Sequence, residues 1–112
     1  MTVFICQGRF TQSAVREMLA KPEDRAEAIG QLFSKVGGKL LAYYMTCGGD
    51  YDFMTISEGS PESMEAAKIV ATAGGGVTDL KTMVAMTSSD MKNAFAKAGS
   101  VAASFRPAGA TS

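Results

Sequence analysis

The chain of 112 residues contains no histidine and no tryptophan, and it has only two cysteines and three prolines. Histidine is the commonest general base near neutral pH, the commonest metal ligand and the usual proximal ligand of haem. Its absence argues against a haem protein, a zinc hydrolase and a Ser-His-Asp hydrolase. We therefore expect no metal site and no cofactor, and any catalysis would rest on Arg, Tyr, Asp, Glu, Lys or Cys side chains.

An excess of charge of one sign is also missing, because 11 basic residues balance 11 acidic ones. No basic run stands out to attract a phosphate backbone, so we expect no nucleic-acid partner. The apolar runs are far shorter than the roughly 20 residues that span a bilayer, so we expect no membrane partner. No signal peptide is visible. Cys6 and Cys47 make no disulfide framework, which favours a cytoplasmic protein with reduced thiols.

Short β-branched and aromatic segments alternate with segments of helical period. The predicted strands are residues 2–10, 39–47, 51–58 and 77–87. Helices are predicted from residue 11 to 36 with a break near Lys21, from Ser60 to residue 73, and after Ser88. The order β-α-β-β-α-β plus a C-terminal helix predicts an α+β, ferredoxin-like fold with strand order 4-1-3-2. Residues 1–98 form the predicted domain, and residues 99–112 are an unpatterned tail or a docked arm.

Both faces of the predicted sheet carry apolar side chains. In the first strand, Phe4 and Cys6 lie on one face, while Val3 and Ile5 lie on the other. Helices cover only one face in this fold, and monomers rarely expose a large apolar surface. We therefore expect two sheets to pack face to face as a dimeric α/β barrel, in a homodimer or a larger homo-oligomer.

The stretch CGGDYDF, residues 47–53, predicts a hairpin between the second and third strands. In the strand order 4-1-3-2, Arg9 lies beside the start of the third strand. The hairpin, the glycines at residues 74–76 and the first helix near Thr11 should then share one rim of the sheet. Backbone amides at the start of a helix, with Arg9 nearby, could bind a carboxylate or a phosphate.

Three stretches of the sequence, RFT at 9–11, GGKLLAYYMTCGGDYDF at 37–53 and VTDLKTMVAMT at 77–87, resemble the GYD-domain family of small bacterial proteins. The Gly-Tyr-Asp signature corresponds to Gly49, Tyr51 and Asp52, with Asp50 between them. The resemblance covers about residues 2–98 and implies a dimeric α/β-barrel fold. It implies no established activity, so it leaves the function open.

The candidate ligand-binding residues all belong to the predicted rim or its neighbouring strands. They are Arg9, Thr11, Tyr44, Gly49, Asp50, Tyr51 and Asp52. Each has a structural alternative. Glycine clusters are more often turns than ligand cradles, and Arg9 with Asp52 could form a salt bridge between neighbouring strands. One of Tyr43 and Tyr44 is expected to pack under a helix and the other to fill the barrel, and buried inert thiols are expected for Cys6 and Cys47.

Two functional hypotheses from different classes follow. The first is an oligomeric module that binds a small anionic or aromatic molecule, or that serves as an accessory subunit of a larger assembly. The second is a cofactor-independent barrel enzyme of the oxygenase or isomerase type. In that enzyme Asp52 would accept a proton, and Arg9 with Tyr44 or Tyr51 would hold an oxyanion. The first is preferred, because no pair of residues specifies a reaction.

Overall fold

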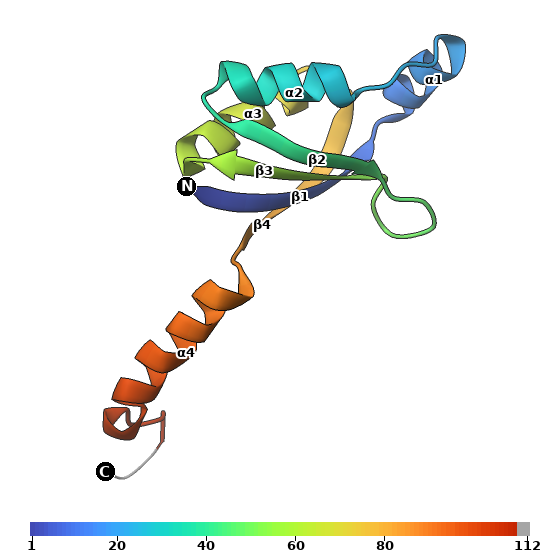
Figure 1. Ribbon diagram of the computed structural model, residues 1–112. Helices are drawn as coiled ribbons and strands as arrows, with labels where there is room; N and C mark the ends of the chain where they lie inside the picture. The colour runs from blue at the N-terminus through green and yellow to red at the C-terminus, as the bar shows by residue number, and fades with distance from the viewer. Residues whose placement is uncertain (110–112) are drawn as a thin grey trace.

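The computed structural model describes residues 1–109 as one antiparallel four-stranded sheet with helices covering one of its faces (Figure 1). The elements are β1 (Thr2–Phe10), α1 (Gln12–Ala20), α2 (Ala26–Lys35), β2 (Lys39–Met45), β3 (Phe53–Gly59), α3 (Pro61–Ala73), β4 (Val77–Ala85), α4 (Ser88–Val101) and the 3-10 turn η1 (Ala102–Ser104). The order across the sheet is β2-β3-β1-β4. This order confirms the predicted α+β, ferredoxin-like topology.

Short polar side chains begin three of the helices. The hydroxyls of Thr11, Ser60 and Thr87 each accept a hydrogen bond from a backbone amide in the first turn of α1, α3 and α4. α1 ends at Ala20, with Lys21 as its C-cap, which confirms the predicted break. α2 begins at Ala26, whose backbone amide donates to Asp24 Oδ1 at 2.9 Å.

The core lies between the sheet and the helices α2 and α3, and the residues buried there are Phe4, Cys6, Phe33, Met64 and Ala67. In α3 the large apolar side chains of Ile69 and Val70 are 65% and 52% exposed. α3 instead turns Met64 and Ala67 inward, and the small Ala67 side chain lets the helix approach the sheet closely.

The hairpin between β2 and β3 is longer than the sequence suggested. β2 ends at Met45 rather than at Cys47, and β3 begins at Phe53 rather than at Tyr51. The connection is closed by the amide of Thr46, which donates to the Asp52 carbonyl oxygen at 2.9 Å. Cys47 consequently lies on an exposed loop, so its predicted burial was wrong, whereas Cys6 is buried and both thiols are free.

The second face of the sheet carries no helix within residues 1–109, and α4 leaves β4 on that open side as a projecting arm (Figure 1). Ile5 of β1 pairs with Ile56 of β3 and Met83 of β4, which places three apolar side chains in one row of this face. The arm gives the chain a longest dimension of 65 Å against 29 and 23 Å. Its helix continues past residue 98, where the sequence indicated the end of the domain, to Val101.

Gly8 supplies a tight contact at the centre of the fold. A Cβ atom at this position would lie 2.5 Å from Leu80 Cδ2 and 2.5 Å from Phe53 Cζ, whereas a Cβ at Gly49 would meet nothing within 4 Å. We predict that Gly8→Ala lowers the free energy of unfolding by about 1–3 kcal/mol, because the core must shift to accept the methyl group. Urea unfolding measures the loss, and Gly49→Ala is the matched control.

If Gly8→Ala and Gly49→Ala lowered the free energy of unfolding equally, the tight packing around Gly8 would be contradicted, because of these two glycines only Gly8 faces packed side chains.

Candidate functional site

The predicted rim exists, and hydrogen bonds hold it together. Arg9 donates from Nε to the Asp50 carbonyl oxygen at 2.7 Å. The amide of Phe10 donates to Asp52 Oδ2 at 2.9 Å, and the amide of Asp52 donates to the Gly8 carbonyl oxygen at 2.8 Å. These bonds tie the β2–β3 hairpin to the end of β1, so Arg9 and Asp52 both act within the fold.

Thr11 joins the start of α1 to the glycine run before β4. Its amide donates to the Gly76 carbonyl oxygen at 3.0 Å, and its hydroxyl donates to the Gly75 carbonyl oxygen at 2.8 Å. The same hydroxyl caps α1 by accepting from the Ala14 amide at 3.2 Å. The rim therefore unites the hairpin, α1 and the glycine run, as the topology predicted.

The structure bears on two predictions for the rim, the salt bridge between Arg9 and Asp52 and the position of Tyr44. Arg9 and Asp52 form no salt bridge, because Arg9 lies over the Tyr51 ring, 5.7 Å from its centroid, and Asp52 binds a backbone amide. Tyr44 takes no part in the hydrogen bonds of the rim, since it stands 60% exposed on the open face of the sheet. Gly49 has empty space around it. The ligand role of these residues and the catalytic role of Asp52 stay predictions.

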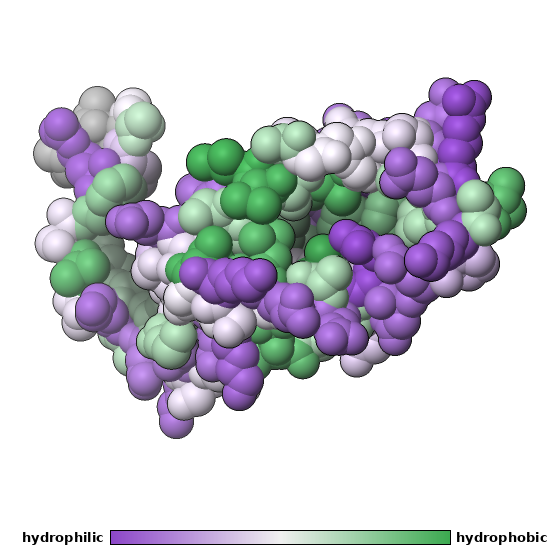
Figure 2. All heavy atoms as spheres, turned by 90° about the horizontal axis from the view of Figure 1, so that it is seen from above, coloured by the Kyte–Doolittle hydropathy of each residue, from purple (hydrophilic) through white to green (hydrophobic). Residues whose placement is uncertain are grey.

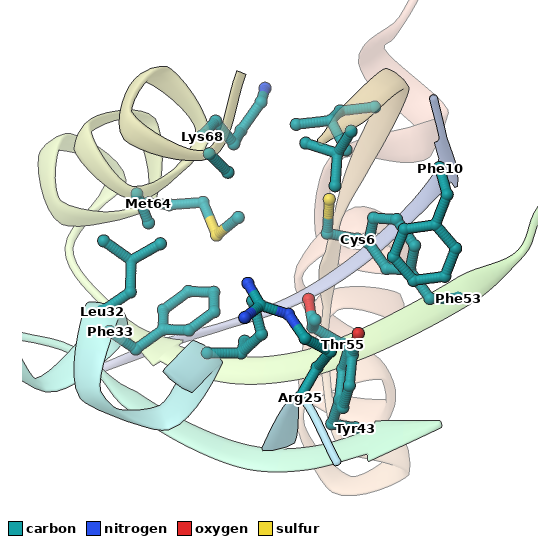
Figure 3. Close-up of a pocket in the computed structure, with 15 residues that line it drawn as sticks. Cys6, Phe10, Arg25, Leu32, Phe33, Tyr43, Phe53, Thr55, Met64 and Lys68 are labelled. Atoms are coloured by element: carbon teal, nitrogen blue, oxygen red, sulfur yellow. The ribbon is translucent and has the colours of Figure 1, made fainter. Parts of the chain in front are cut away.

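A cavity of about 60 Å³ lies elsewhere, between the sheet and the helices α2 and α3 (Figure 3). One water molecule needs about 10–15 Å³ of such space, so the cavity admits a group of several heavy atoms. Its fifteen lining residues are Cys6, Phe10, Arg25, Ile29, Leu32, Phe33, Tyr43, Phe53, Thr55, Met64, Ala67, Lys68, Ala71, Val77 and Leu80. Most are apolar, two are basic, and no aspartate or glutamate is among them.

The polar groups of the cavity come from neighbouring strands and from the residue that precedes α2. Tyr43 of β2 pairs with Thr55 of β3, which in turn pairs with Cys6 of β1, so the three lie in one row across the sheet. Figure 3 shows the Arg25 guanidinium pointing toward the middle of the cavity. One cation and two hydroxyl-bearing side chains therefore line a cavity whose walls are mostly apolar.

The Thr55 hydroxyl is the unexplained group of this cavity. Thr55 is 5% exposed, and its Oγ1 has no hydrogen-bond partner among the described residues. A buried polar group without a partner costs about 1–3 kcal/mol, and native proteins contain few of them. An unpaired hydroxyl in a cavity that also holds Arg25 and Tyr43 is suited to binding a polar group of a ligand.

Burial favours the protonated, neutral forms of the cysteine and the tyrosine that line the cavity. It raises the pKa of the Cys6 thiol, which is therefore an inert group at neutral pH rather than a nucleophile. It also raises the pKa of the Tyr43 hydroxyl, against the opposing effect of Arg25, while Asp24 adds to the rise. Tyr43 thus keeps its proton and can donate a hydrogen bond.

The cavity continues into a larger groove of about 500 Å³ between α1, α2 and α3. Arg25, Ile29 and Phe10 line both spaces, so Arg25 stands where they join. Figure 2 shows apolar surface in the middle of this side of the molecule, between polar edges. The groove exists because α1 stands apart from the helix layer, with Leu19 82% exposed.

Sequence comparison matches residues 4–95 to the GYD domain, which is most of the chain. The chain belongs to the GYD domain family. Its signature residues Gly49, Tyr51 and Asp52 form the hairpin side of the rim, so in this GYD domain the signature stabilises the hairpin against β1. No curated protein matches the chain in sequence.

Two solved structures resemble the GYD domain in fold. One is the crystal structure of FFRP-DM1, with 14% sequence identity and a TM-score of 0.44, covering 77% of this chain and 100% of that one. The other is the crystal structure of TTHA0845 from Thermus thermophilus, with 19% identity and a TM-score of 0.43, covering 78% of this chain and 95% of that one. Both likenesses concern the fold alone.

The described part of the GYD domain contains neither a metal-binding cluster nor a membrane-spanning helix. Within residues 1–109, no group of three or more His, Cys, Asp or Glu residues is arranged to hold a metal ion. Over the same residues, none of the helices combines the length and the apolar character needed to cross a bilayer.

The cavity was not predicted from the sequence, although one signal was present. In the third strand Phe53, Thr55 and Ser57 fall on one face, at every second residue, so two hydroxyls share the face of the aromatic ring that enters the core. A polar residue on the buried face of a strand needs a partner. The strand pattern therefore marks both Thr55 and Ser57, and the structure separates them, because Ser57 Oγ donates to Met64 Sδ at 3.7 Å whereas Thr55 Oγ1 has no partner among the described residues.

We predict that Asp52→Ala lowers the free energy of unfolding by about 1 kcal/mol, because the Phe10 amide loses its acceptor. Asp52→Asn should keep most of the stability, since its carbonyl oxygen can accept the same bond. Asp50→Ala is the matched control, because Arg9 binds the backbone oxygen of Asp50 and not its carboxylate. Urea unfolding of the three variants checks this, and a loss for Asp50→Ala as large as for Asp52→Ala would contradict it.

We also predict that a chromogenic disulfide reagent modifies Cys47 rapidly and Cys6 only on unfolding, because Cys47 is exposed and Cys6 is buried. The folded protein should release about one equivalent of chromophore within minutes and the unfolded protein two. Rapid reaction of both thiols in the folded chain would show that Cys6 is accessible.

Proposed function

We propose that this GYD domain is a small-molecule-binding module that works as a homo-oligomer, with its ligand in the cavity beneath α2 and α3. The observation that carries the proposal is the buried, unpartnered hydroxyl of Thr55 in a cavity that also contains Arg25 and Tyr43. Binding sites are typically apolar hollows with a few convergent polar groups, and this cavity has that composition.

Self-association is proposed through the open face of the sheet. Ile5, Ile56 and Met83 form an apolar row there without a covering helix, with Tyr44 exposed nearby. A second copy packed face to face would bury both open faces at once, with the same residues on each side. Such packing would produce the dimeric α/β barrel expected from the sequence, which one chain with an open sheet does not form alone.

The arm α4 supports self-association independently. Phe95 of α4 is 72% exposed and Met91 is 46% exposed, and α4 packs chiefly against η1 at its own end. An isolated helix of about 12–15 residues is only marginally stable in water. A partner copy on the open side of the sheet, the side on which the arm leaves (Figure 1), would cover this apolar stripe.

Native mass spectrometry of the purified full chain tests the ligand proposal. We predict a protein species with additional mass from a co-purified small molecule, which is lost on acid denaturation, because the cavity has an unsatisfied hydroxyl to bind it. A Thr55→Val protein purified in the same way should retain less of that mass. A native spectrum that contains only unliganded chains, even after incubation with mixed metabolites of low molecular mass, would contradict ligand binding.

Two neighbouring residues of β4 test the interface. Met83 pairs with Ile5 on the open face, and Val84 pairs with Phe4 on the helix-covered face. Both side chains are largely exposed in one chain, at 48% and 61%. We predict that Met83→Asp weakens self-association at least about tenfold, because a charge would enter the apolar interface, whereas Val84→Asp changes it little.

Sedimentation equilibrium measures both variants. A monomeric wild-type protein at micromolar concentration would contradict the proposed homo-oligomer, and equal effects of the two variants would place the interface elsewhere.

A further inference from the structure

The cavity and the groove differ in chemistry in a way that indicates the class of ligand. Arg25, Tyr43 and Thr55 line the small inner cavity, and Arg25 also lines the groove. The groove is larger, and apolar residues that include Phe10, Ile29 and Val70 line it together with the charged side chains of Glu17, Lys21 and Glu23. A molecule with a compact polar end and an extended apolar body would match both spaces.

The polar end must be negatively charged to match the charges of the cavity. The two charged residues that line the cavity, Arg25 and Lys68, are both basic. The planar fork of the Arg25 guanidinium suits the two oxygens of a carboxylate. The hydroxyls of Thr55 and Tyr43 can each donate one further hydrogen bond to such an oxygen.

Arg25 is free to change partners. Its Nη1 lies 3.1 Å from Glu23 Oε1, and the two side chains are 38% and 54% exposed. A salt bridge as exposed as this one contributes little. A carboxylate held inside the cavity would meet the same guanidinium in a less polar environment, where the attraction is stronger. Lys68 forms a similar pair, with its Nζ 3.1 Å from Glu65 Oε1 on the same helix.

We propose that the ligand is a monocarboxylic acid with an apolar body, whose carboxylate binds Arg25, Thr55 and Tyr43 while its body lies in the groove beside α1. The proposal rests on the ligand-binding function proposed above. A monocarboxylate fits better than a phosphate, because a phosphate would bring a second charge and more oxygens into a mostly apolar cavity of about 60 Å³.

Isothermal titration calorimetry of the full chain tests the class of ligand with three probes of one chain length, decanoate, decanol and decylamine, each below its micelle concentration. Decanoate should bind at least about tenfold more tightly than either of the others, because only it carries the charge that Arg25 complements. Decanol binding as tightly as decanoate would overturn the carboxylate assignment while leaving a ligand-binding cavity in place. Failure of decanoate to bind at all would overturn it as well, and native mass spectrometry would then decide separately whether the protein binds another ligand.

Variants of the full chain test the assigned residues. Arg25→Met should weaken decanoate binding at least about thirtyfold and leave decanol binding unchanged. Lys68→Met is the matched control, because Lys68 lines the same cavity but its ammonium points away from Arg25 and Thr55 (Figure 3), and it should change decanoate binding less than about threefold. A larger loss for Lys68→Met than for Arg25→Met would overturn the role of Arg25.

Thr55→Val should change two quantities in opposite senses, the affinity for decanoate and the stability of the free protein, and a hydroxyl with only a structural role would not give this combination. It should weaken decanoate binding about tenfold and raise the urea midpoint of the free protein, because it removes a buried hydroxyl that has no partner. Thr55→Ser should restore binding. A Thr55→Val protein with a lowered midpoint and unchanged decanoate affinity would overturn the role of Thr55.

Discussion

A single layer of helices against a four-stranded sheet gives that sheet two unlike faces, and the rest of the molecule depends on this constraint. On the covered face, α2 and α3 bury Phe4, Phe33 and Met64 but leave a cavity over Thr55. On the open face, Ile5 and its neighbours have no covering element among the described residues. The proposed ligand belongs to the first face and the proposed partner copy to the second, so the two functions do not compete for one surface.

The GYD signature acts at a third place, the rim where β1, the hairpin and α1 meet. There Asp52 holds the Phe10 amide and Arg9 holds the Asp50 carbonyl oxygen. These bonds fix the end of β1 whose Phe10 lines both the cavity and the groove. The signature thus supports the candidate site by shaping it, although its own polar groups are engaged within the fold. Thr55 is different, because its unpaired hydroxyl is a cost that the fold alone does not offset.

Local patterns allowed the topology to be predicted. Strand and helix periods, the Ser60-Pro61 helix start and the break at Lys21 follow from neighbouring residues, and the strand order follows from the βαββαβ sequence of elements. The rim was also predictable, since topology alone brings Arg9 to the hairpin. The cavity was not, because its shape depends on how closely α3 approaches the sheet and on α1 standing apart. Those distances depend on packing between distant residues, which the period of one segment does not encode.

The central claim is that the ligand binds beneath the helices and not inside a barrel formed on the open face. Backbone NMR of the full chain during titration with decanoate distinguishes these two binding sites. The account predicts that the largest chemical-shift changes fall on Arg25, Tyr43 and Thr55 and saturate together. Changes centred instead on Ile5, Ile56 and Met83 of the open face, with Thr55 unaffected, would contradict it.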